Sequence, residues 1–339
     1  MSFCIAPFVH MVQNPDGQYR TCCMYDKPLQ GNYKDIKEAF DSKENSVIRQ
    51  RMLSGEVLPE CNKCDIDEKH EGKEWPSYRY YFNTKYSKDF VNKPTFKSLE
   101  ISVSNKCNLK CVDCGPRFSN QFGPTITNTL PKSLYFKDVE HIKVLGGEPF
   151  LDKRNIELLE LVNRQETSIM IVTNNTIFPN EKTLSILDEF KHLDINVSID
   201  GINDVAEFVR EGTKWSRFER NWNKWKKFWF PRRERCYLIP HIVVHSYNAP
   251  FIQEIIDWLS LPLEDISWDF LHQPDWLNVS YLPVEIKQYI LDSNLSLKPP
   301  LEKFINSNEY DENVFNVLRE NISTKDIPES MESYIDLFF

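Results

Sequence analysis

The chain of 339 residues lacks a surplus of positive charge, a long apolar run and an export signal. It carries 41 Lys and Arg against 50 Asp and Glu, whereas general nucleic-acid binding needs an excess of cations to neutralise phosphates. No stretch approaches the length of a membrane-spanning apolar segment. The start, MSFCIAPFVHMVQ, has neither the basic segment nor the long apolar core of a signal peptide. We therefore expect a cytoplasmic protein that has no membrane partner and is unlike a general nucleic-acid binder.

What the chain does have is nine cysteines, most of them in close groups. The cytosol keeps thiols reduced, so C-x2-C and C-x3-C spacings in this context predict metal ligands rather than disulfides. Cys107, Cys111 and Cys114 follow a short alternating apolar run with C-x3-C-x2-C spacing. Four thiolates close a [4Fe–4S] cluster, so three leave one iron open to a ligand from solution. The alternative is a zinc knot, although zinc prefers paired C-x2-C units and four closed ligands.

From residue 94 to 275 short β-rich runs alternate with helix-like segments, which predicts βα units and a parallel sheet. The fold class that follows is α/β, a partial (βα)6 TIM-like barrel, with a helical extension at 276–339. In parallel barrels the reactive residues lie at the carboxyl ends of the strands. The six predicted strands are 98–104, 141–145, 168–173, 194–199, 237–244 and 266–270.

Residues 1–93 form a separate region with short, broken apolar periodicity and five cysteines. A region this small and rich in loops is more easily stabilised by a metal centre than by its own core. We predict a cysteine-stapled module. Its cysteines are Cys4, Cys22, Cys23, Cys61 and Cys64.

Polar and glycine-rich motifs stand at the predicted strand ends. Gly146, Gly147, Glu148 and Pro149 follow the second strand, where glycines let the backbone approach a ligand and a carboxylate accepts hydrogen bonds from an ammonium group. Small polar groups suit ribose hydroxyls, and an Arg pairs bidentately with a carboxylate. Each residue taken singly also fits a turn or a cap. The polar residues after the third and fourth strands are Thr173, Asn174, Asn175, Ser198, Asp200 and Arg210.

The cysteine motif, followed about thirty residues later by Gly-Gly-Glu-Pro, resembles the radical S-adenosylmethionine (SAM) enzymes. In that family the open iron holds the amino and carboxylate groups of SAM, and an electron from the cluster cleaves SAM to a 5′-deoxyadenosyl radical. The resemblance implies that Cys107, Cys111 and Cys114 are the catalytic cluster ligands. It also implies a SAM site made of Gly146, Gly147, Glu148, Pro149, Thr173, Asn174, Ser198 and Arg210. Asp200 fits a structural role equally well.

The amino-terminal cysteines resemble the first half of a SPASM pattern: Cys4, then Gly17-x4-Cys22, then Cys61-x2-Cys64. That shortened form is the twitch domain, which holds one auxiliary [4Fe–4S] cluster; here it precedes the barrel, as in a set of phage and bacterial twitch-domain proteins. The resemblance implies Cys4, Cys22, Cys61 and Cys64 as cluster ligands and leaves Cys23 as a spare. A zinc site with the same four ligands is the alternative.

The chain departs from the usual family pattern at Asp113, where an aromatic or apolar residue is common. The resemblance implies an oxidoreductase or maturase-type enzyme that abstracts hydrogen from a peptide or small-molecule substrate. Its auxiliary cluster would accept an electron, and its partners would include a reducing electron donor such as flavodoxin or ferredoxin. One alternative is a nucleotide or tRNA substrate recruited by nine basic residues in 214–235, although the aromatics there recur at helical spacing and predict a buried face. The other is a non-catalytic, metal-stapled binding protein.

Overall fold

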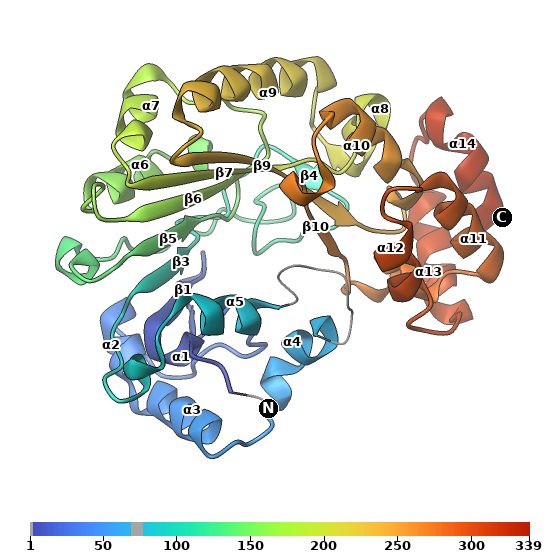
Figure 1. The fold of residues 1–339 in the computed structure, drawn as a ribbon. Helices are drawn as coiled ribbons and strands as arrows, with labels where there is room; N and C mark the ends of the chain where they lie inside the picture. The colour runs from blue at the N-terminus through green and yellow to red at the C-terminus, as the bar shows by residue number, and fades with distance from the viewer. Residues whose placement is uncertain (1–2, 69–76) are drawn as a thin grey trace.

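The computed structural model describes residues 3–68 and 77–339 (Figure 1). Its centre is an eight-stranded sheet in the order β10-β9-β7-β6-β5-β3-β1-β2, in which only β2 is antiparallel to its neighbour. A two-stranded sheet, β4-β8, lies apart from it. The strands are β1 (His10–Gln13), β2 (Tyr19–Arg20), β3 (Ser98–Ile101), β4 (Lys110–Cys111), β5 (His141–Val144), β6 (Ser168–Thr173), β7 (His192–Ser198), β8 (Arg210–Glu211), β9 (Cys236–Val244) and β10 (Ser267–Phe270).

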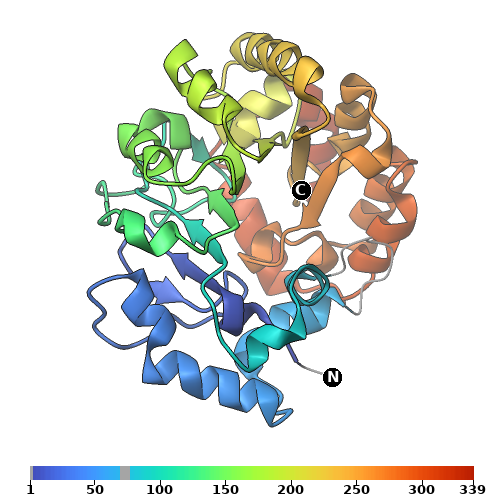
Figure 2. The same ribbon diagram turned by 60° about the vertical axis from the view of Figure 1, so that its left-hand side comes forward.

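All six predicted strands are present, as β3, β5, β6, β7, β9 and β10, and all run parallel. The α/β prediction is therefore confirmed, and so is the helical carboxyl-terminal region. In Figure 2 the strands of the large sheet pass from blue at the lower left through green to orange on the right, in the order of the sheet. The helices are α1 (Ala6–Val9), α2 (Ile36–Asp41), α3 (Lys43–Leu53), α4 (Asn62–Asp67), α5 (Tyr78–Lys85), α6 (Lys153–Glu160), α7 (Glu181–Asp188), α8 (Asn203–Val209), α9 (Trp215–Trp229), α10 (Ile252–Leu259), α11 (Val284–Ser293), α12 (Lys298–Ile305), α13 (Glu312–Ile322) and α14 (Glu329–Ile335).

The two faces of the sheet differ in chemistry. Leu99, Ile142 and Leu193 are fully buried in the main apolar core, together with side chains of the outer helices. Their strand neighbours Glu100 and Lys143 point to the other face, because successive side chains of a strand alternate. The sheet thus has an apolar outer layer and a polar inner face.

The amino-terminal region joins this sheet. β1 pairs with β3 in parallel register, His10 opposite Ser98, so the barrel sheet continues into the first 93 residues. Helix α5 packs against the polar face: the Tyr78 hydroxyl lies 2.7 Å from Lys143 Nζ, and the ring centroids of His10 and Phe82 are 4.7 Å apart. In Figure 1 α4 and α5 accordingly lie on the opposite side of the sheet from α7 and α9.

Helix α9 buries its aromatic face, as its periodicity predicts. Phe218, Trp222 and Trp225 are at most 3% exposed, whereas its Lys and Arg side chains are exposed. Burying large aromatic side chains against the core is what holds an amphipathic helix in place. Among the described residues, no helix is long and apolar enough to cross a membrane.

Candidate active site at the carboxyl ends of the strands

The cysteine motif lies in the loop after β3. Pairing between β4, which is part of this loop, and β8 fixes its conformation. β4 pairs antiparallel with β8, which places Cys111 opposite Arg210. The backbone N–H of Leu109 turns toward Cys107 Sγ at 3.5 Å. The local fold thus brings the predicted cluster ligand Cys111 beside Arg210, the Arg that the family resemblance implies for the SAM site.

The three thiols share an electrostatic setting. Burial raises the pKa of Cys111 to about 12 and that of Cys114 to about 11, while the Arg210 guanidinium acts in the opposite direction on both and on Cys107. A buried thiol becomes a thiolate when a cation compensates it, and the thiolate is the form that binds metal. These cysteines suit a metal-bound state.

The glycines after β5 approach the cysteine loop. Gly147 has φ +56°, and a Cβ there would lie 2.0 Å from the carbonyl oxygen of Lys106. A Cβ on Gly146, at φ +86°, would lie 2.4 Å from the Ser102 side chain. The sequence predicts that these glycines let a ligand approach; the close neighbour that the structure gives them is the segment leading into Cys107.

Glu148 lies at the centre of a buried set of hydrogen bonds. It is 1% exposed and accepts bonds from the Thr173 hydroxyl at 2.9 Å and from the Asn174 backbone N–H at 2.8 Å. Burial raises the pKa of Glu148 to about 7, although these donors and Arg210 act in the opposite direction. Pro149 starts a short 3-10 turn and accepts a hydrogen bond from the Asn155 side chain at 2.9 Å.

The pKa of Glu148 leads to a prediction for the Glu148→Gln variant. The folded state binds this proton more tightly than the unfolded chain, whose Glu pKa is ordinary, so the carboxyl favours folding below about pH 4.5, and this contribution is lost as pH rises through about 7. Between about pH 5 and about pH 8 the free energy of unfolding of the wild type should fall relative to the variant by roughly 3 kcal/mol. Urea unfolding of both metal-free proteins measures this, and a difference that does not change with pH would contradict it.

Asn174 connects the end of β6 to the cysteine loop. Its side-chain Nδ2 lies 3.7 Å from Cys107 Sγ and 3.2 Å from Asn108 Oδ1. Hydrogen bonds to cluster sulfurs are one of the ways in which a protein adjusts an iron–sulfur potential. The family resemblance implies that Asn174 is part of the SAM site. In the structure its side chain contacts Cys107, the first cysteine of the motif.

Arg210 is held by Asp200. Asp200 accepts hydrogen bonds from Arg210 Nη1 and, at 2.8 Å, from the Val243 backbone N–H. Arg210 Nε is buried and has no hydrogen-bond partner among the described residues. The guanidinium thus keeps a donor for a ligand while Asp200 positions it.

Asp113 and Ser198 differ in what surrounds them. Burial and the neighbouring Asp200 raise the pKa of Asp113 to about 6, against the effect of Arg210. Asp113 therefore belongs to the group around Arg210. Ser198 ends β7 opposite His241 and is half-buried on the inner face.

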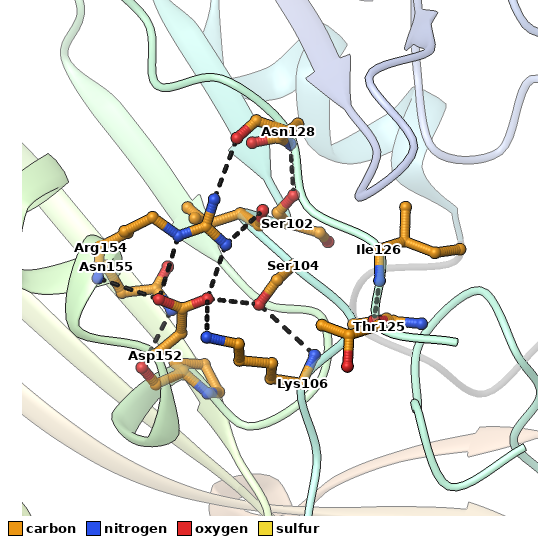
Figure 3. Close-up of polar contacts among 12 residues, drawn as sticks. Ser102, Ser104, Lys106, Thr125, Ile126, Asn128, Asp152, Arg154 and Asn155 are labelled. Atoms are coloured by element: carbon orange, nitrogen blue, oxygen red, sulfur yellow. Dashed lines mark hydrogen bonds and ion pairs between the residues drawn. The ribbon is translucent and has the colours of Figure 1, made fainter. Parts of the chain in front are cut away.

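One supporting network has no motif that would reveal it in the sequence. Asp152, which caps α6, is 2% exposed and accepts hydrogen bonds from the Ser104 hydroxyl at 2.7 Å and from Arg154 Nη2 at 2.6 Å (Figure 3). Lys106 Nζ lies 3.8 Å from the same carboxylate. Only the Asp at the start of a helical pattern is a sequence signal here. The network ties the segment before Cys107 to α6.

The four amino-terminal cysteines predicted as ligands line one pocket. Cys4 precedes α1, Cys22 follows β2, and Cys61 and Cys64 lie at and within the start of α4. Arg79 also lines this pocket. No three His, Cys, Asp or Glu side chains in 3–68 and 77–339 are arranged to hold a single metal ion. The donors are thiols, the ligand type of iron–sulfur clusters.

Cys23 is not among the residues that line this pocket. Its thiol interacts with Cys22 and is within electrostatic reach of Glu100 and Lys143 on the polar face of the sheet. The hydrogen bond with Cys22, burial and Glu100 raise the pKa of Cys23 well above the usual range, and Lys143 acts in the opposite direction. Cys23 thus lies beside Cys22 but outside the lining of the pocket.

Comparison with known proteins identifies the central segment. Residues 101–259 match the family described as the radical SAM superfamily. A probable GTP 3′,8-cyclase of Methanocaldococcus jannaschii is 32% identical over 136 residues, 39% of this chain and 45% of that protein. The subtilosin biosynthesis protein AlbA of Bacillus subtilis is 26% identical over 121 residues, 34% of this chain and 27% of that protein. The chain thus spans less than half the length of these two relatives.

Two solved structures also match. Native anSMEcpe with bound AdoMet has 20% identity and a TM-score of 0.43, and the match covers 66% of each chain. SuiB of Streptococcus suis bound to S-adenosylmethionine has 14% identity and a TM-score of 0.41, covering 86% of this chain and 66% of that one.

Proposed function

We propose that this chain, whose residues 101–259 match the radical SAM superfamily, binds a [4Fe–4S] cluster and SAM and abstracts hydrogen from a peptide or small-molecule substrate. When bound, the cluster supplies the electron that cleaves SAM to a 5′-deoxyadenosyl radical. The observation that carries the proposal is the convergence of the cysteine loop, Glu148 and Arg210 at one end of the sheet. The domain match supports it independently.

In this proposal the chain's own residues bind and orient SAM. Cys107, Cys111 and Cys114 would hold the cluster through three of its irons, which would leave one iron available to SAM. Glu148, backed by Thr173 and Asn174, receives the ammonium group, and its ionised form is favoured when that cation arrives. Arg210, with its unpartnered Nε, donates to the SAM carboxylate. Ser198, on the inner face, contacts the ribose.

The amino-terminal cysteine pocket supports a second part of the proposal, an auxiliary [4Fe–4S] cluster of twitch type. Four thiols would occupy all four irons, so this centre transfers electrons instead of binding substrate directly. A cluster held by these four cysteines would accept the electron that the substrate loses, together with a proton, after its hydrogen atom has been abstracted. The net change is a two-electron oxidation, and a low-potential donor such as flavodoxin or ferredoxin reduces the SAM-binding cluster.

Release of 5′-deoxyadenosine tests the first part. Anaerobically reconstituted protein, reduced with dithionite and given SAM, should release it, and Cys107→Ala should reduce release to background because the cluster loses a ligand. Cys236→Ala is the matched control: Cys236 is fully buried in β9, outside both cysteine groups, and its variant should keep activity. Loaded wild type that releases none would instead support a non-catalytic, metal-stapled binding protein.

A nucleotide or tRNA substrate is the second candidate, favoured by the relative named as a GTP 3′,8-cyclase and by the exposed basic side chains of α9. Arg232, in the same basic segment, is already held by Asp188, with Nε–Oδ1 and Nη2–Oδ2 distances of 2.6 and 2.9 Å. The accessible cations are therefore Lys226, Lys227 and their neighbours. Binding of GTP and of tRNA to the protein is measured at low and at high salt. Binding that weakens as the salt concentration rises favours the nucleotide or tRNA substrate over the peptide or small-molecule substrate, because phosphate contacts weaken with salt.

A further inference from the structure

Arg79 lies beside the amino-terminal cysteines, and no sequence motif indicates this position. Arg79 is the second residue of α5, is 5% exposed, and lines the pocket that holds Cys4, Cys22, Cys61 and Cys64. Its backbone N–H also donates a hydrogen bond to the Cys64 sulfur. One residue thus brings both a guanidinium and a backbone donor to the four thiols.

The contacts of the guanidinium leave part of it free. Nη1 lies 2.7 Å from Asp65 Oδ1 and 3.0 Å from Glu68 Oε2. Nη2 is buried and has no hydrogen-bond partner among the described residues. A buried polar donor without a partner costs free energy, so Nη2 keeps an N–H available to a ligand that accepts a hydrogen bond.

The Arg79 side chain is more deeply buried than the two carboxylates that pair with it. The Arg79 side chain is 6% exposed, whereas those of Asp65 and Glu68 are 30% and 34% exposed. Water screens the two carboxylates more than it screens the guanidinium, because the strength of a charge rises as the local dielectric falls. The guanidinium is within electrostatic reach of Cys4, Cys61 and Cys64, where it favours negative charge on the sulfurs, and the carboxylates of Asp65, Asp67 and Glu68 act in the opposite direction.

We propose that Arg79 raises the reduction potential of the auxiliary cluster and so makes that cluster the electron acceptor of the reaction. The inference rests on the proposed function. Four thiolates make the centre anionic, and reduction adds one more negative charge. A buried cation beside the sulfurs stabilises the reduced state more than the oxidised state, so one electron moves more readily from the substrate radical to the cluster.

A redox titration followed by electron paramagnetic resonance tests this in a parent whose Cys107, Cys111 and Cys114 are all Ala, so that only the amino-terminal site can hold iron. Arg79→Gln keeps hydrogen-bond donors and removes the charge; its reduction equilibrium should shift at least tenfold toward the oxidised state, a midpoint about 59 mV lower. Arg79→Lys keeps the charge and should stay within about threefold of the parent.

Asp65→Asn gives the opposite control. This variant removes a negative charge from the same ion pair, so the reduction equilibrium of the cluster should shift toward the reduced state. If the ion pair had only a structural role, Arg79→Gln and Asp65→Asn would not shift the equilibrium in opposite directions. Shifts in the same direction, or a parent-like potential in Arg79→Gln, overturn the inference. If Arg79→Gln holds no iron, Arg79→Lys and Asp65→Asn decide it. A parent without iron overturns the auxiliary cluster itself, and the inference with it.

Discussion

The variant with Cys107, Cys111 and Cys114 all replaced by Ala is expected to keep about four irons and four sulfides after anaerobic reconstitution, against about eight of each in the wild type. The reason is that Cys4, Cys22, Cys61 and Cys64 line a single pocket, apart from the loop after β3. Iron, sulfide and zinc content are measured together. Further replacement of Cys4 and Cys64 by Ala should remove the remaining iron, because two of the four ligands are lost.

Two results would contradict this expectation. A single zinc in the triple variant would make the amino-terminal site structural, since zinc also uses four thiolates and C-x2-C pairs. No metal at all would leave one cluster in the protein, and the reaction would then be redox-neutral. Cys23→Ala is the matched control because Cys23 lies next to Cys22 in the chain but is not among the residues that line the pocket; it should leave the iron content unchanged.

Gly147→Ala is expected to abolish loading of the SAM-binding cluster. The new Cβ would lie 2.0 Å from the Lys106 carbonyl oxygen and 2.6 Å from its carbon, so the backbone directly before Cys107 has to move. The left-handed φ adds about 1–2 kcal/mol and the displaced packing about 1–3 kcal/mol. Iron content, SAM binding and the free energy of unfolding measure the effect, and we expect a loss of at least half of the iron together with all SAM binding.

Gly55→Ala separates strain from the clash. Gly55 also has a left-handed φ, +76°, but a Cβ there would meet no atom within 4 Å. This variant should lose about 1–2 kcal/mol of stability and keep both clusters. If Gly147→Ala behaves in the same way, the contact between the glycine turn and the cysteine loop does not position Cys107.

Local patterns in the sequence predict the parallel strands well. The run at 168–173 coincides with β6, and the run at 98–104 contains β3, which ends earlier at Ile101 because the chain then turns into the cysteine loop. Strand-end motifs also predict which residues gather at one edge, since the carboxyl ends of parallel strands meet there. Glu148 and Thr173 are such a pair, 25 residues apart and hydrogen-bonded.

Other features depend on partners that are distant in the chain. β1 adds to the barrel sheet beside β3, 88 residues later, and no periodicity in the first 93 residues indicates this pairing. The close neighbour of Gly147 is the Lys106 backbone, and the polar face of the sheet is covered by α5. Such contacts follow from packing, which local propensity does not encode.

The amino-acid sequence by itself determined the spacing of the two cysteine groups, the six parallel strands and the position of the polar motifs at their ends, because spacing and periodicity are local properties of a chain. Only the tertiary structure decided that Asp200 holds Arg210 beside Cys111, that Asp152 supports the cysteine loop, and that Arg79 reaches the amino-terminal cysteines. These contacts depend on burial and on the distance between groups that are far apart in the sequence. Burial and distance together set the interaction energy between two charges inside a protein.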